Sequence, residues 1–173
     1  MIETDKTCFF SGHRKLPEHN KEKIISLIEK NILLKYNAGI TNFISGGALG
    51  FDTIAAQTVI RLKTNRDLYK KMRLILFLPC YDSDINWSIN DRNLLSFIKF
   101  NADLVEVIEK SGYTQSCMKV RNRKMVESSC SGIVYKSSNH SGTGQTVSIA
   151  RKLGIPVVNI ADCLRFRGHD NST

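Results

Sequence analysis

The chain has 173 residues, of which 42% are hydrophobic, and a formal net charge of +9. This length suits a single domain with one sizeable core. No stretch approaches the roughly 18 apolar residues of a membrane helix, and the first six residues lack the apolar core of a secretion signal. These features exclude a membrane protein and favour a cytoplasmic protein with anionic partners, such as nucleotides or nucleic acid.

The five cysteines are odd in number and contain no C-x-x-C pair. We therefore expect reduced thiols and no zinc or other metal site. No cysteine has an evident base beside it in the sequence, so none is predicted as a catalytic nucleophile.

Strands and helices are predicted to alternate from the start of the chain. A short apolar strand at 7–10 precedes a helix at about 20–36, whose apolar positions share one face. A second strand at 40–44 enters a glycine-rich turn, and a helix with apolar positions from 51 to 62 leaves it. Residues 63–72 form a polar connection.

The second half of the chain continues the alternation. Residues 74–78 are apolar at every position, which is typical of a parallel strand covered on both faces. The remaining elements are expected as a helix at 86–99, a strand at 104–108, a helix at 117–128, a strand at 132–135, a helix ending near 154 and a strand at 156–160. This order predicts an α/β, Rossmann-like doubly wound fold, with a mainly parallel sheet of about six strands and helices on both faces. It occupies residues 1–164 as a single domain, and 165–173 form a polar tail.

The glycine-rich turn from Ser45 to Asp52 is the first candidate site. A strand, a glycine-rich turn and a helix bring backbone N–H groups together at a helix N-terminus, which suits a phosphate. Glycine that serves only the packing of a tight turn is the alternative. Five segments, 11–14, 45–52, 79–84, 110–118 and 137–144, are expected to meet at the carboxyl ends of the strands, where such sheets bind ligands. This convergence favours a nucleotide or phosphate site.

Several candidate side chains keep more than one role open. Asp52 suits a helix cap, a ribose hydroxyl or a general base. His13 suits acid–base chemistry or a structural hydrogen bond. Arg121 and Arg123 are two residues apart and do not share a helix face, so at most one reaches the pocket. Asp82 and Asp84 suit a ribose hydroxyl, a metal, solvation of the loop or a helix cap, but two acids without a third ligand do not predict a metal.

Five ordered motifs carry a resemblance to a known family. They are Ser11 to Arg14, Ser45 to Asp52, Pro79 to Asp82, Cys117-Met118 with Arg121 to Val126, and Ser141 to Thr146. In this order they resemble the YpsA-like family of the SLOG superfamily, which includes the "Lonely guy" phosphoribohydrolases and DNA-processing protein A. The resemblance implies a Rossmann-like fold, a nucleotide-type ligand without a required cofactor, and a homo-oligomer.

Two departures from related motifs bear on the chemistry. The phosphoribohydrolases use P-G-G-x-G-T-x-x-E, whereas the loop from Ser141 to Thr146 lacks the proline and no acid follows it before Asp162. This argues against N-glycosidic hydrolysis. Leu49 stands where DNA-processing protein A has an arginine, so one cation that would bind a backbone is lost.

The leading hypothesis is a protein that binds a nucleoside phosphate or an NAD- or ADP-ribose-like ligand for sensing, regulation or sequestration. One alternative is an enzyme that cleaves the N-glycosidic bond of a nucleoside monophosphate, with Asp52 as its catalytic residue. Another is a single-stranded nucleic-acid binder that uses cations at 61–73 and 119–124, although no interleaved aromatic residues support it. The predicted ligand-binding residues are Gly12, His13, Arg14, Ser45, Gly46, Gly47, Gly50, Asp52, Tyr81, Asp82, Arg121, Asn122, Gly142, Thr143 and Gly144.

Overall fold

One parallel sheet of six strands organises the protein, in the order β4-β3-β2-β1-β5-β6. The computed structural model describes residues 2–165 except 111, 113, 115, 139 and 140. The strands are β1 (Thr7–Gly12), β2 (Asn42–Ser45), β3 (Arg73–Cys80), β4 (Leu104–Glu109), β5 (Ser131–Tyr135) and β6 (Val157–Asn159). Every neighbouring pair is parallel, so the predicted Rossmann-like α/β fold is confirmed.

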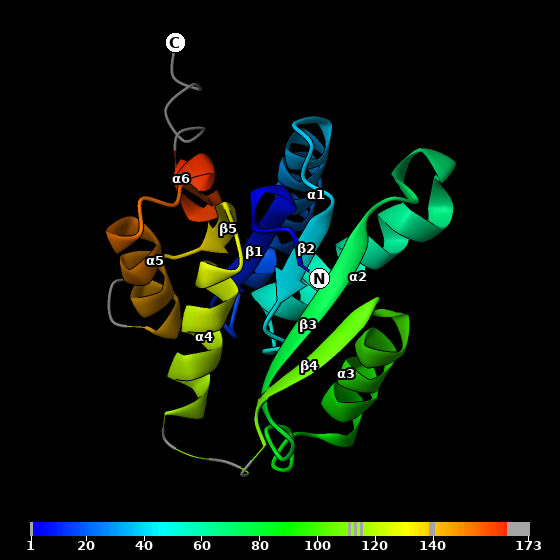
Figure 1. Ribbon diagram of the computed structural model, residues 1–173. Coiled ribbons are helices and arrows are strands. Elements are labelled where there is room, and N and C mark those ends of the chain that lie inside the picture. The colour runs from blue at the N-terminus through cyan, green and yellow to red at the C-terminus, as the bar shows by residue number, and fades with distance from the viewer. Residues whose placement is uncertain (1, 111, 113, 115, 139–140, 166–173) are drawn as a thin grey trace.

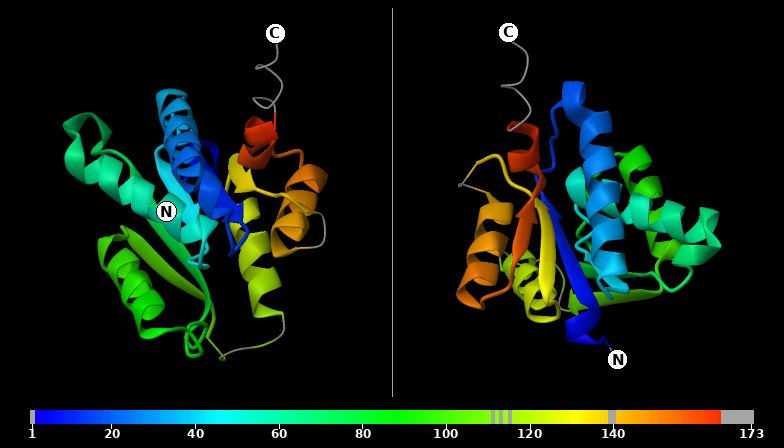
Figure 2. Two further views of the ribbon diagram at one scale, coloured as in Figure 1. Left: turned by 180° about the vertical axis from the view of Figure 1, so that it is seen from behind. Right: turned by 90° about the horizontal axis from the view of Figure 1, so that it is seen from above.

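Helices cover both faces of the sheet (Figure 1). Those that pack through one core cluster are α1 (Lys21–Asn37), α2 (Phe51–Asn65), α3 (Ile89–Asn101) and α6 (Ile160–Arg165). The opposite layer consists of α4 (Cys117–Glu127) and α5 (Gly142–Lys152). The view from above in Figure 2 places α5 and α1 on opposite sides of the sheet. Three short 3₁₀ turns, η1 (Thr4–Lys6), η2 (Glu18–Asn20) and η3 (Asp67–Tyr69), complete the described elements.

The strand β3 shows why its sequence is apolar at successive positions. Leu74, Leu76 and Leu78 pack toward the α1–α2–α3 layer, while Ile75 and Phe77 pack toward α4 and α5. Successive side chains of a strand point to opposite faces, so a strand between two helix layers has no polar face. All five residues are buried.

Two element boundaries differ from the sequence prediction. The third helix begins at Ile89 rather than near 86, because the Ser88 hydroxyl caps it and accepts a hydrogen bond from the Asp91 N–H at 3.1 Å. The last strand ends at Asn159, since buried Ile160 already begins α6, which the sequence analysis did not predict. Of the predicted polar tail, Arg165 ends α6, and residues 166–173 lie outside the described part.

The chain order reverses at β1. From β1 the chain builds β2, β3 and β4 on one side, then returns to place β5 and β6 on the other. The chain therefore runs from β1 and from β5 to helices on opposite faces of the sheet, which leaves a crevice at the carboxyl ends of these strands. No helix in the described part of the chain has the length and apolarity needed to cross a lipid bilayer.

Candidate functional site

A pocket of about 340 Å³, here called the strand-end pocket, lies at this crevice. Its walls come from four parts of the chain: the end of β1, the start of α2 with the turn before it, the first two turns of α4, and the start of α5. The residues that line it are Ser11, Gly12, His13, Arg14, Ala48, Asp52, Met118, Arg121, Asn122, Ser141, Gly142 and Thr143.

Asp52 lines the strand-end pocket and is only 4% exposed. Its Oδ1 accepts a hydrogen bond from the Gly12 N–H at 3.1 Å, which ties the end of β1 to the start of α2. Burial raises the pKa of this carboxyl to about 6, although Arg121 and the backbone N–H groups of Gly12 and Gly46 pull the pKa down. The carboxyl is thus held in place by the backbone and titrates near neutral pH.

Arg121 is the cation that accompanies Asp52. It is 5% exposed, and its Nη1 donates a hydrogen bond to the Gly46 carbonyl across the pocket wall. Its Nε is buried and has no hydrogen-bond partner among the described residues. Burial lowers the pKa of the guanidinium, while Asp52 opposes that shift. Because an arginine stays protonated in proteins, the pocket holds a permanent positive charge.

Two glycines of the turn after β2 are fixed by close contacts. A Cβ on Gly46 would collide with the Arg121 guanidinium and lie 2.9 Å from Asp52 Oδ2. Gly50 has a φ of +83° and would place a Cβ against the main-chain carbonyls of Arg14 and His13. The glycines therefore bring the two loops together, which supports the packing role that the sequence left open.

His13 has a structural hydrogen bond. Its Nε2 accepts the Ser137 N–H at 2.9 Å, which joins the loop after β1 to the loop after β5. Partial burial lowers the pKa of this imidazole, and an accepting Nε2 requires its unprotonated form. The ring also packs edge-on against Tyr135, with 5.9 Å between the centroids. These contacts favour the structural role over acid–base chemistry.

The N-terminus of α5 forms one end of the pocket. The Ser141 hydroxyl caps this helix and accepts the Gly144 N–H at 3.1 Å. Gly142 and Thr143 face the pocket from the first turn, where backbone N–H groups lack partners within the helix. The positive end of the helix dipole therefore points to the same space as Arg14 and Arg121.

The predicted site residues fall into three groups. The strand-end pocket brings together Gly12, His13, Arg14, Asp52, Arg121, Asn122, Gly142 and Thr143. Gly46 and Gly47 line a small side pocket that shares Arg14 and Arg121 with it. The structure places Ser45, Gly50, Gly144, Tyr81 and Asp82 outside both pockets.

Residues of the third group have other surroundings. The Ser45 hydroxyl is buried, donates to the Asp52 carbonyl at 3.1 Å and accepts the Gly47 N–H at 3.2 Å. Tyr81 and Asp82 lie exposed in the turn after β3. Among the described residues, no three side chains of His, Cys, Asp or Glu gather as a metal site would require.

Four lining residues were not among the predicted ligands: Ser11, Ala48, Met118 and Ser141. Ser11, Ala48 and Ser141 adjoin predicted glycines, so the motifs themselves contained the signal. Met118 follows Cys117 in the fourth motif, but an apolar side chain in the first turn of α4 gives no chemical indication of a pocket.

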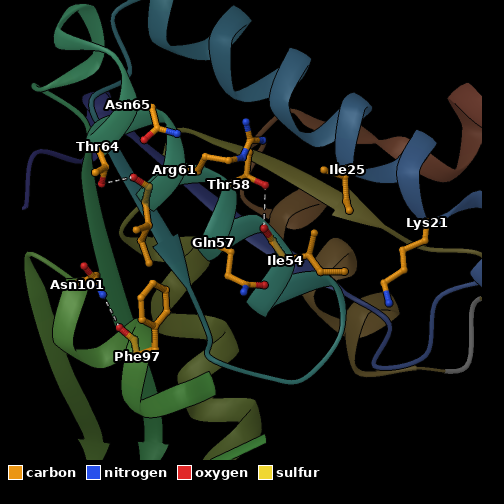
Figure 3. Close-up of a pocket in the computed structure, with 11 residues that line it drawn as sticks. Lys21, Ile25, Ile54, Gln57, Thr58, Arg61, Thr64, Asn65, Phe97 and Asn101 are labelled. Carbon is orange, nitrogen blue, oxygen red and sulfur yellow. Dashed lines mark hydrogen bonds between the residues drawn. The ribbon is translucent and has the colours of Figure 1, made fainter. Parts of the chain in front are cut away.

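A larger pocket of about 640 Å³ lies away from the strand ends, between α1, α2 and α3 (Figure 3). Its polar side chains do not converge on a ligand position. Thr58, Thr64 and Asn101 each bond back to a carbonyl of their own helix. Size alone does not make a site, and we assign the functional role to the strand-end pocket, where charge, a helix N-terminus and strand ends coincide.

The fold and this pocket define a Rossmann-like α/β protein with a cationic pocket at the topological switch point. The YpsA family model, described as YspA SLOG family, matches residues 11–152. The chain therefore belongs to the YpsA SLOG family, and the resemblance inferred from its motifs is confirmed.

Proteins of two Bacillus species are similar to the chain over most of its length. A UPF0398 protein of Bacillus cereus strain B4264 is 27% identical over 135 residues, which covers 77% of this chain and 72% of the relative. A UPF0398 protein of Bacillus thuringiensis strain Al Hakam is 26% identical over 136 residues, with 75% and 72% covered.

Two solved structures of DNA processing protein A share the fold. The Helicobacter pylori protein, described for its single-stranded DNA binding mode, superposes with a TM-score of 0.62 at 20% identity over 96% of this chain and 74% of that one. The Streptococcus pneumoniae protein gives 0.64 at 18% identity, over 88% of this chain and 49% of that one.

Proposed function

We propose that the strand-end pocket binds the phosphate of a nucleoside phosphate or of an NAD- or ADP-ribose-like molecule. The observation that carries this proposal is that Arg14, Arg121 and the N-terminus of α5 face one pocket. A helix N-terminus and a guanidinium are both strong partners for phosphate oxygens. The volume of about 340 Å³ lies within the range of about 300–1,000 Å³ that is usual for small-molecule sites.

Asp52 has a supporting role in this proposal. Its hydrogen bond to Gly12 and its proximity to Arg121 hold the pocket wall, and a carboxylate that lines the pocket suits a ribose hydroxyl better than a phosphate, which it would repel. A protein that binds the ligand for sensing, regulation or sequestration needs no further catalytic group.

Gly142 offers a direct test, because a Cβ built there meets nothing within 4 Å. Gly142→Asp adds a negative charge at the phosphate position, and Gly142→Asn adds a neutral side chain of the same size. We expect the Asp variant to bind AMP, ADP-ribose or NAD at least tenfold more weakly than the Asn variant, measured by calorimetry. The melting temperature of the Asp variant should be no lower than that of the Asn variant, because an acid at a helix N-terminus is stabilising. If the two variants bind each of the three ligands with the same affinity, the proposal is contradicted.

The same samples test the hydrolase alternative. Release of free adenine from AMP by the purified protein, lost in Asp52→Asn, would establish cleavage of the N-glycosidic bond. If the protein binds AMP but releases no adenine during prolonged incubation, the hydrolase alternative is rejected and only the binding function remains.

A second candidate function is the binding of single-stranded nucleic acid, favoured by the charge of the layer beside the pocket. The helices α4 and α5 contain six lysines and arginines and a single acid, Glu127. A groove of about 420 Å³ runs between them, here called the α4–α5 groove, and contains Lys119, Arg123 and Lys152. More than half of the net charge of the molecule thus lies on two helices.

The α4–α5 groove continues from the strand-end pocket. Asn122 lines the pocket and Lys119 lines the groove three residues away, on adjacent positions of the α4 surface. On α5 the pocket ends at Thr143 and the groove begins at Gln145. A single-stranded nucleic acid with one phosphate in the pocket has its next phosphates beside the lysines and the arginine of the α4–α5 groove. The fold shared with the DNA processing protein of Helicobacter pylori, described for single-stranded DNA, supports this candidate.

This candidate predicts that affinity rises with oligonucleotide length and falls steeply with salt. Replacement of Lys119, Arg123 and Lys152 by Ala removes three phosphate contacts and should reduce the slope of log K against log salt by about 2 for a single strand. The control replaces Lys23, Lys30 and Lys71, which removes the same charge elsewhere. Anisotropy titrations with oligothymidylate measure both, and equal slopes in the two triple variants would exclude the groove.

A further inference from the structure

Two cysteines from distant parts of the chain meet beside the strand-end pocket. Cys80 is the last residue of β3, and Cys117 is the first residue of α4. The Cys117 thiol donates to the Cys80 sulfur, with 3.9 Å between the two Sγ atoms. Both side chains are fully buried. By contrast, Cys130 donates to backbone carbonyls, those of Asp5 and Thr7.

We propose that Cys80 and Cys117 are an oxidative modification site, at which a peroxide converts the two thiols into a disulfide that alters the strand-end pocket. A disulfide has an S–S length of about 2.05 Å, so the sulfur atoms must approach by about 1.9 Å. Exposed residues adjoin both cysteines, because Ser116 precedes Cys117 and Tyr81 follows Cys80. The proposed step requires a shift at the start of α4, where the Cys117 N–H bonds Thr114 Oγ1 at 3.0 Å, that brings the sulfurs together and admits a small oxidant.

The chemistry balances with hydrogen peroxide as the oxidant. One sulfur, as thiolate, attacks a peroxide oxygen, the O–O bond breaks, and a sulfenic acid and water form. The second thiol then attacks the sulfenic sulfur, loses its proton and expels a second water. Two thiols and one peroxide thus give one disulfide and two waters, with two electrons passing to the peroxide. A small dithiol reverses the step by thiol–disulfide exchange.

The resting pair is protected from casual oxidation. Burial raises the pKa of the Cys80 thiol, and the neighbouring Cys117 raises it further. A protonated thiol is a poor nucleophile, so reaction requires an opening of the first turn of α4 or a sustained oxidant.

The disulfide acts on the pocket through α4. Cys117 and Arg121 are four residues apart, so they share one face of this helix, and both are buried on it. Pro79, which precedes Cys80, lines the small side pocket with Gly46, Met118 and Arg121. Movement of Cys117 toward Cys80 therefore displaces Arg121 from the Gly46 carbonyl and from the anion position. This effect on affinity rests on the proposed function, whereas the formation of the disulfide does not.

The first experiment detects the bond itself. Purified protein is treated with hydrogen peroxide, free thiols are alkylated, and tryptic peptides are mapped without reduction. We expect a Cys80–Cys117 cross-linked peptide that a dithiol removes, present in the matched control Cys130→Ser and absent from Cys117→Ser and Cys80→Ser. Oxidation of other cysteines without this peptide would overturn the proposal.

The second experiment measures the coupling to the pocket. We expect oxidation to weaken AMP binding at least threefold in the wild type and in Cys130→Ser, and to leave Cys117→Ser unchanged. Hydrogen exchange of residues 117–127, compared before and after oxidation, reports the displacement of α4 even if AMP does not bind at all. A mapped disulfide with unchanged exchange in α4 would reject the coupling, while altered exchange without any nucleotide binding would reject only the proposed function.

Discussion

Asp52 shows how a single buried side chain combines the structural and the chemical properties of the pocket. Its carboxyl accepts a backbone N–H from β1 and lies beside Arg121, yet burial still raises its pKa to about 6. The desolvation penalty of a charge moved from water into a protein interior can exceed its Coulombic attraction to one neighbouring cation. The charged form of Asp52 is therefore retained at a cost in stability.

We predict a pH signature for this residue. The folded pKa of about 6 exceeds the ordinary value of 3.8, so the folded state holds the proton more tightly. Protonated Asp52 therefore stabilises the folded state relative to ionised Asp52. This contribution to the free energy of unfolding is full below pH 3.8 and is lost as pH rises through about 6. Asp52→Asn does not ionise, and its free energy of unfolding should gain on the wild type by up to about 3 kcal/mol between pH 4 and pH 7. Urea titrations across this range measure the difference, and parallel profiles would refute the prediction.

The turn between β2 and α2 shows how an element depends on contacts outside itself. Its glycines match a phosphate-binding pattern, but Gly50 meets the carbonyls of His13 and Arg14, and Gly46 meets Arg121. The His13 carbonyl also accepts the Phe51 N–H at 3.2 Å. The turn is thus shaped by the loop after β1, and this contact helps to form the strand-end pocket.

A pair of glycine variants compares backbone strain alone with strain and this contact together. Gly50 and Gly154 both have a positive φ, of +83° and +70°, but a Cβ on Gly154 meets nothing within 4 Å. Gly154→Ala should cost about 1–2 kcal/mol from strain alone. Gly50 has a ψ of −119°, outside the left-handed helical region, and its Ala variant also collides with main chain that cannot move aside, so we expect it to lose at least about 2 kcal/mol more. Denaturant unfolding of the two variants gives the comparison, and equal losses would show that the contact is loose.

At the scale of the whole molecule, one edge of the sheet is uncovered. The edge strand β4 exposes Leu104 and Val105, and α3 beside it exposes Phe97 and Phe100, the latter by 89%. An edge strand presents unpaired backbone groups that an identical strand can meet across a twofold axis. The expected homo-oligomer therefore has a suitable surface at α3 and β4.

We predict that the purified protein has a mass above the 19.5 kDa of one chain in light scattering. Phe100→Ser should shift the population toward the monomer, because it removes the most exposed aromatic side chain of this surface. Leu68→Ser, at an equally apolar and 73% exposed position on η3, serves as the control. A wild-type monomer, or equal behaviour of the two variants, would argue against this interface.

The alternation of strands and helices, the parallel sheet and most residues of the pocket could be predicted from the amino-acid sequence, since these features follow from local periodicity and from motifs at strand ends. The spacing of Arg121 and Arg123 also predicted that at most one of them reaches the pocket. In the structure Arg121 is buried and Arg123 is exposed. Three features could be seen only in the folded chain: Tyr81 and Asp82 lie away from the pocket, His13 bonds Ser137, and Cys80 contacts Cys117. Such contacts join residues 37 and 124 positions apart. They depend on strand order and on the exact packing of loops, which no local pattern of residues encodes.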